Sequence, residues 1–260
     1  MLGDTTQLLP ERAPVRDPAT VGVLARAGMI LRLLGTVPGG ISLGQIARQA
    51  GLPRSTVHRL IAGLEAEGLV DVGTGSSQIK LGSEFLRLAQ VTRPSVLDRM
   101  HPIMVELSAE TGETADLSMV RRTDLFFVEQ VIGTERLLAV SRVGDSFPLH
   151  CTSVGKAYLA AQPLSAVERL IGTSYPRHTS NTRITLDGLS VEFQKIRATG
   201  VSVDLEEHAL GIAAIGIAFQ GKPGEWFGLS VPLPMQRFAE KRAFVTRRLL
   251  DTKAILKARS

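Results

Sequence analysis

The sequence has one cysteine, no long apolar run and a long stretch without acidic residues. The single cysteine, Cys151, excludes a disulfide within the chain and any zinc or iron–sulfur site that needs several cysteines of one chain. The longest clean apolar run, residues 209–219, is too short for a bilayer, which takes about 20 residues. The first residues do not resemble a signal peptide, so we expect a cytoplasmic protein with no membrane partner.

The composition is that of a folded protein. Of the 260 residues, 44% are hydrophobic and 21% are charged. These values exclude a wholly disordered chain, and the length predicts one or two domains. Because no short repeat runs through the sequence, collagen-like and coiled-coil fibres are also excluded.

Acidic residues are missing between Pro18 and Leu64, in a chain whose net charge is +5. A stretch with charge of one sign is what the phosphate backbone of a nucleic acid attracts. Charge alone does not distinguish a nucleic-acid-binding surface from a chance distribution of arginines. The pattern of helices and strands in this stretch has to distinguish them. The residues of this stretch that carry or can gain a positive charge are Arg26, Arg32, Arg48, Arg54, His58 and Arg59.

Three runs of apolar residues at helical spacing lie in this part of the chain. The first predicts a helix from Thr20 to the glycine-containing turn at residues 37–40. Ser42 is a good N-cap for a short second helix, which Gly51 ends. Pro53 suits the first turn of a third helix.

Two short alternating segments, residues 69–72 and 78–81, flank a turn with glycine and predict a β-hairpin. Three short helices and a hairpin make a winged helix-turn-helix, whose third helix reads the DNA. The alternative is a three-helix core with a solvated basic face. The side chains that we expect to face DNA are Ser42, Arg54, Ser55, Thr56, His58, Arg59, Thr74 and Ser76.

The rest of the chain mixes helices and strands, which predicts an α+β domain with antiparallel strands and its own core. Residues 82–110 are expected to be helical, with an interruption near Pro94. Further helices are expected over residues 153–161, 165–171, 186–199 and 237–258. Strands are expected over residues 114–120, 124–131, 137–140, 147–150, 201–204, 213–219 and 226–231.

Motifs in both parts of the chain resemble those of the IclR-type transcriptional regulators, and they occur in the same order. In the first part they are residues 42–47, 51–60 and 64–70, with Gly51-Leu52-Pro53-Arg54-Ser55-Thr56-Val57-His58-Arg59-Leu60 at the centre. In the second part they are residues 111–114, 141–144, 149–157 and 200–208. The resemblance covers about residues 20–258.

This resemblance implies a flexible tail (1–17), a winged helix-turn-helix (18–82), a linker helix (83–95) and a GAF-like effector-binding domain with an antiparallel sheet (96–260). It also implies a homodimer or a dimer of dimers on roughly palindromic double-stranded operator DNA. A small organic or aromatic acid would control the affinity for the operator. Similar regulators act as repressors or activators, and we expect a repressor.

In similar regulators the effector contacts the segment after a Leu-His pair, an aspartate, a residue ten positions later and serines of the last strand. The matching residues here are Cys151, Thr152, Ser153, Val154, Asp204, Ala214 and Ser230. Two positions depart from the family pattern: Ala214 stands where some members have cysteine, and Pro232 where another serine occurs. With fewer polar side chains, the effector of another member cannot simply be carried over.

Residue chemistry supports the same site. Thr152 and Ser153 precede a predicted helix, whose free N–H groups and positive dipole end can hold a carboxylate. Asp204 suits a ligand hydroxyl or amine. Each residue also has a purely structural interpretation: Thr152 and Ser153 can cap the helix, Asp204 can close a turn, and Cys151 can be a small packed residue.

An enzyme that uses a thiol or a metal is the rival class. Cys151 follows His150, but adjacent residues of a strand point to opposite faces, so we expect this pair not to share a proton. The polar residues of 204–208 could hold a metal, although their spacing is not that of a standard ligand set. The phosphate-loop, nucleophile-elbow and zinc-protease motifs are missing, so we expect no enzyme and no cofactor.

A regulator whose second domain only oligomerises is a further alternative. A purely architectural DNA-binding protein would need no large second domain. A pocket lined by Ser153, Asp204 and Ser230 would argue against both.

Overall fold

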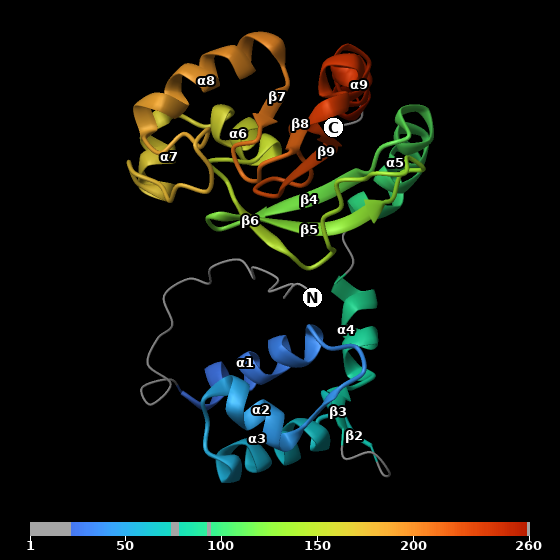
Figure 1. Cartoon of the computed structure of the whole chain (residues 1–260), viewed down its shortest axis with the longest axis vertical. Coiled ribbons are helices and arrows are strands. Elements are labelled where there is room, and N and C mark those ends of the chain that lie inside the picture. The colour runs from blue at the N-terminus through green and yellow to red at the C-terminus, as the bar shows by residue number, and fades with distance from the viewer. Residues whose placement is uncertain (1–21, 74–77, 93–94, 259–260) are drawn as a thin grey trace, which may run out of the picture. The chain divides into compact units, whose positions relative to one another are not determined.

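The structure, a computed structural model, describes residues 22–73, 78–92 and 95–258 (Figure 1). It divides into two compact units, Met1–Arg93 and Pro94–Ser260. The predicted tail over residues 1–17 lies outside the described residues, and so do Thr74 and Ser76 of the hairpin turn.

The first unit is a helix-turn-helix with a small antiparallel sheet, as predicted. Its elements are α1 (Val23–Gly35), β1 (Ile41–Ser42), α2 (Leu43–Ala50), α3 (Arg54–Ala66), β2 (Val70–Val72), β3 (Gln78–Leu81) and α4 (Glu84–Thr92). The strand β1 was not expected; it pairs with β3, so the sheet has the order β1-β3-β2.

Local signals determine the turn between α2 and α3. Ser42 and Gln45 form a capping box at the start of α2, and Gly51 ends the helix in the left-handed conformation, with φ 63°. The buried residues Ile46, Val57 and Ile61 then join the two helices in one core.

The second unit is a six-stranded antiparallel sheet with helices on both faces. Its order is β6-β5-β4-β9-β8-β7, which confirms the predicted α+β class. The elements are α5 (Ser95–Thr111), β4 (Ala115–Arg121), β5 (Asp124–Val131), β6 (Ser146–Pro148), α6 (Ser153–Ala160), α7 (Leu164–Ile171), α8 (Leu186–Thr199), β7 (Ser202–Leu205), β8 (Ile212–Gln220), β9 (Trp226–Pro234) and α9 (Met235–Ala258).

Two strand predictions were wrong. Leu137–Val140 is irregular and pairs with no strand; β4 and β6 occupy both edges of β5, the strand that precedes it in the chain. The predicted strand 147–150 is shorter: β6 ends at Pro148, and Leu149 and His150 form a turn before α6.

The two faces of the sheet bury different side chains. Alternate residues of β9, including Leu229 and Val231, pack with α5 and α9 in a large apolar core. The residues between them face α6, and α6 to α8 share a second core that includes Leu159 and Phe193. Figure 1 shows α6, α7 and α8 together on one side of the sheet.

Glycines let α6 lie close to the sheet. A Cβ atom at Gly228 of β9 would lie 1.9 Å from Cγ1 of Val154, and one at Gly216 of β8 would lie 2.8 Å from Oγ of Ser153. On the helix itself, a Cβ at Gly155 would lie 2.3 Å from the carbonyl oxygen of Leu149. The side chains of Ser153 and Val154 therefore lie directly against the strand backbone at Gly216 and Gly228, and Gly155 lies against the turn before the helix.

We expect Gly155→Ala to lower the free energy of unfolding of the second unit by about 1–3 kcal/mol, because the added methyl group meets backbone that cannot turn away. Unfolding in urea can be followed by the fluorescence of Trp226, the chain's one tryptophan. Gly188→Ala in α8 is the control. A Cβ atom at Gly188 would lie 3.3 Å from its nearest neighbour, Oγ1 of Thr185. This substitution should therefore change the free energy of unfolding by less than about 1 kcal/mol. Equal stability of the two variants would contradict the close approach.

Candidate functional site

The helix α3 presents a polar face to solvent. Arg54, Ser55, His58 and Arg59 are exposed and Thr56 is half-buried, while Val57, Ile61 and Leu64 are buried in the core. The five predicted DNA-facing side chains of α3 therefore lie in the first two turns of the helix, and four of them are exposed.

Ser42 has a structural role of its own. Its hydroxyl accepts the backbone N–H of Gln45 and donates to Oε1 of Gln45 at 2.8 Å. This capping box makes Ser42 less free for a phosphate than the residues of α3.

The strand register gathers the predicted effector residues on the α6 face of the sheet. Asp204 of β7 lies opposite Ala214 of β8, and Ala214 lies opposite Pro232 of β9. In the adjacent row, Ser230 of β9 lies opposite Asp116 of β4. Strands far apart in sequence thus place these side chains side by side.

A cavity of about 170 Å³ opens beside these rows, and we call it the sheet cavity. Its apolar wall consists of Leu125, Phe127, Ala139, Val140, Phe147, Val154, Ala209, Ile212, Ala214 and Pro232. Its polar side chains are Asp116, Ser141, Thr152, Ser153, Asp204, His208 and Ser230. Among the described residues, no lysine or arginine lines it.

Asp116, which the sequence analysis missed, is 1% exposed at the cavity wall. Its carboxylate accepts hydrogen bonds from Nε2 of Gln130 at 2.7 Å and from Oγ of Ser141 at 2.9 Å. Burial raises the pKa of Asp116 to about 6, against the lowering effect of both donors. A lone acidic residue inside the apolar strand 114–120 was the available signal.

Asp204 is 5% exposed, and its Oδ1 accepts the backbone N–H of Glu207 at 2.7 Å. This hydrogen bond is the turn interaction expected from the structural interpretation of Asp204. The carboxyl group also lines the sheet cavity. Burial raises the pKa of Asp204 to about 7, and the donated N–H and Lys156 oppose this rise. The sheet cavity therefore holds two carboxyl groups that titrate near neutral pH.

The start of α6 faces the same cavity through Thr152, Ser153 and Val154. Thr152 is the N-cap residue, but its side chain does not cap the helix; its hydroxyl donates to the carbonyl oxygen of Pro148 at 2.9 Å. The dipole of α6 thus points its positive end at the sheet cavity. It supplies partial positive charge to a cavity that has no lysine or arginine among its described lining residues.

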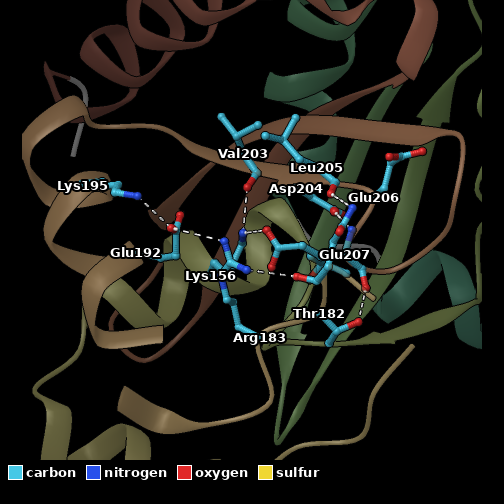
Figure 2. A network of polar contacts seen from close by, with 12 residues as sticks. Lys156, Thr182, Arg183, Glu192, Lys195, Val203, Asp204, Leu205, Glu206 and Glu207 are labelled. Atoms are coloured by element: carbon cyan, nitrogen blue, oxygen red, sulfur yellow. Dashed lines mark hydrogen bonds and ion pairs between the residues drawn. The ribbon is translucent and has the colours of Figure 1, made fainter. Parts of the chain in front are cut away.

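A buried ion pair connects α6 to β7 and to the segment that follows it. Lys156 of α6 is 0% exposed and donates from Nζ to Glu207 and to the carbonyl oxygen of Val203, the latter at 2.7 Å. Burial raises the pKa of Glu207, and Lys156 opposes this rise. Figure 2 shows Lys156 reaching from its helix to the strand that carries Asp204.

Cys151 is 0% exposed and does not line the sheet cavity, unlike the six other predicted effector residues. Burial raises the pKa of its thiol. The expectation that His150 and Cys151 point to opposite faces of a strand was wrong, because the two residues form a turn. His208, which lines the cavity, was considered only as a metal ligand; burial lowers its pKa to about 4.

Two protein-family models match successive parts of the chain. The family model of the IclR helix-turn-helix domain matches residues 23–72, and that of the bacterial transcriptional regulator IclR C-terminal domain matches residues 88–255. The chain belongs to the IclR family of DNA-binding transcriptional regulators. The family consists of regulators rather than enzymes, which confirms the expectation of no enzyme.

Individual IclR relatives match over most of their length. The HTH-type transcriptional regulator Rv1719 of Mycobacterium tuberculosis is 41% identical over 88% of this chain and 89% of its own. The transcriptional repressor IclR of Escherichia coli is 30% identical over 86% of this chain and 85% of its own.

Solved IclR structures share the fold. The IclR homologue of Microbacterium hydrocarbonoxydans, complexed with 4-hydroxybenzoate, has a TM-score of 0.75 at 21% identity and covers 91% of this chain and 100% of its own. Thermotoga maritima IclR has a TM-score of 0.72 at 26% identity, over 88% of this chain and 94% of its own.

A bilayer-crossing helix is not found in the part of the chain that the structure describes.

We expect Lys156→Met to lower the free energy of unfolding by about 3–5 kcal/mol, because it leaves the Glu207 carboxylate buried without its cation. Adding Glu207→Leu should recover most of this loss, since no charge then stays buried. Urea unfolding monitored by Trp226 measures both variants. A double variant as unstable as the single one would show that packing, rather than charge pairing, holds α6.

Proposed function

We propose that this IclR-family protein is a repressor whose affinity for its operator is controlled by a small aromatic acid bound in the sheet cavity. The observation that carries the proposal is the cavity itself. It combines an apolar wall, the N-terminal end of α6 and the carboxyl groups of Asp116 and Asp204.

On the DNA side, the exposed face of α3 supports binding in a major groove. Arg54 and Arg59 can bond bidentately to guanine, and Ser55, Thr56 and His58 can reach bases or phosphates. We propose that Thr74 and Ser76 of the hairpin turn contact the flanking backbone, and that Ser42 supports α2 at the groove edge. Two copies of the chain would place two α3 helices on the half-sites of a roughly palindromic operator, as a dimer or a dimer of dimers.

On the effector side, the size and polarity of the sheet cavity favour one substituted ring. A cavity of about 150 Å³ in another protein holds benzene, and this one measures about 170 Å³. The ligand's carboxylate would lie at the N–H groups of α6. A hydroxyl group of the ligand would donate to Asp204, with Ser153 and Ser230 as further partners.

An oligomerisation-only second domain is the rival function. It would leave two ionisable carboxyls buried at a cavity for no purpose, and burying them costs free energy. Because the Microbacterium relative is complexed with 4-hydroxybenzoate, this compound is the first ligand to test.

The test is a titration of the chain with its own upstream DNA at several salt concentrations, with and without 4-hydroxybenzoate, benzoate and related acids. A change in operator affinity with one compound supports the proposal. Unchanged affinity with the whole panel, together with no binding of any compound to the free protein, would favour oligomerisation only.

We expect Arg54→Ala to weaken operator binding by about 1–3 kcal/mol and to reduce the preference for the operator over random DNA, because Arg54 reads a base. Fluorescence anisotropy with both DNAs measures this. Arg169→Ala, which removes an exposed arginine from α7, is the matched control and should leave both affinities unchanged. An equal loss on operator and random DNA would assign Arg54 to a phosphate.

We also expect benzoate-type acids to bind more tightly as the pH falls from 8 to 6. Above pH 7 both Asp204 and Asp116 are ionised, so they repel the carboxylate of the ligand. Because the pKa of Asp204 is about 7 and that of Asp116 about 6, protonation of these groups removes the repulsion as the pH falls. The affinity can increase by up to about tenfold per pH unit for each proton taken up. Isothermal titration measures it, and Asp204→Asn should flatten it. Affinity that increases with pH would overturn the assigned charges.

A further inference from the structure

Three side chains with metal-binding atoms lie together beside the sheet cavity. His150 and Cys151 come from the turn before α6, and His178 comes from the loop between α7 and α8. One ligand atom from each lies within 4.8 Å of the others. None of the three lines the sheet cavity, so the proposed effector site does not use them. We call this group the His–Cys cluster.

The fold holds the loop of His178 in place. The backbone N–H of His178 donates to Oγ1 of Thr182 at 3.1 Å, and the hydroxyls of Thr179 and Thr182 donate to the carbonyl oxygens of Glu206 and Glu207, each at 2.6 Å. The loop is therefore attached to the segment after β7, and His178 keeps its position beside the turn of Cys151.

A backbone carbonyl fixes one ring nitrogen of His150. Its Nε2 lies 3.0 Å from the carbonyl oxygen of Pro176. An imidazole that donates its Nε2–H to a carbonyl has its lone pair on Nδ1, which is the arrangement of metal-ligating histidines in proteins.

One of the three residues reaches the surface. His178 is exposed, whereas His150 and Cys151 are buried, so the cluster has one ligand in contact with solvent.

We propose that His150, Cys151 and His178 bind one Zn²⁺ ion per chain, with the fourth position open to water. One sulfur and two imidazole nitrogens suit zinc, whereas calcium and magnesium prefer oxygen. Zinc bond lengths of about 2.0–2.3 Å place tetrahedral ligand atoms about 3.3–3.6 Å apart. The three atoms, which lie within 4.8 Å of one another, therefore have to move closer together, through rotation of the exposed His178 side chain and adjustment of the turn that carries His150 and Cys151.

The site is independent of the proposed function but lies next to it. Thr152 and Ser153, which follow Cys151, line the sheet cavity, and the ring of His178 lies 5.2 Å from that of His208, which also lines it. When zinc binds, the thiol proton leaves to solvent and a thiolate–zinc bond forms.

The test uses the full chain, stripped with a chelator and titrated with Co²⁺ and then Zn²⁺. We expect one Co²⁺ per chain, a thiolate-to-cobalt charge-transfer band and visible bands of tetrahedral strength, all displaced by Zn²⁺. Cys151→Ser should abolish the charge-transfer band. His178→Ala should weaken binding at least about tenfold, as does loss of even an outer-shell partner. Exposed His101 lies outside the cluster, and His101→Ala is the control.

Three results would overturn the proposal: a weak spectrum without the thiolate band, equal binding by the His178→Ala variant and the unchanged chain, or loss of binding in His101→Ala, which would assign the metal to the surface. Because His178 is exposed, its variant keeps the test valid even where Cys151→Ser fails to fold, and urea unfolding followed by Trp226 checks the fold of each variant.

Discussion

The pairing of Lys156 with Glu207 is the interaction on which the second unit depends. It joins α6 to the segment after β7 where both side chains are buried, and the backbone N–H of Glu207 in turn donates to Asp204. A buried ammonium is tolerated only with such partners. Figure 2 shows this contact between Lys156 and Glu207. Because Lys156 is in the first turn of α6, the contact also fixes the start of that helix, whose residues Thr152, Ser153 and Val154 line the sheet cavity.

Close packing and the cavity have a common origin. Glycines at Gly216 and Gly228 let α6 approach the sheet, while Asp116, Ala214 and Ser230 on the same face leave space that the helix does not fill. Carboxyl groups in such a space lose hydration, so their pKa values rise toward neutrality. An apolar cavity that holds titrating carboxyls responds both to the shape of a ligand and to its charge.

Sequence reasoning worked where a signal is local. Helical spacing, the capping residue Ser42 and the left-handed Gly51 predicted the helix-turn-helix, because each acts within a few residues of the chain. It failed where the structure of a segment depends on a partner that is distant in the sequence. Leu137–Val140 is apolar like a strand but pairs with none, and Asp116 reaches the cavity wall through the strand register that sets it opposite Ser230 of β9.

By itself, the sequence determined the order of the elements, the polar face of α3 and the family, since periodicity, caps and motifs are properties of neighbouring residues. Which side chains meet was decided by the tertiary structure alone. Strand register brought Asp116 and Asp204 to one cavity, and a turn in place of a strand brought Cys151 to His150 and His178. Such contacts depend on pairing between distant segments, and no local pattern encodes their distances.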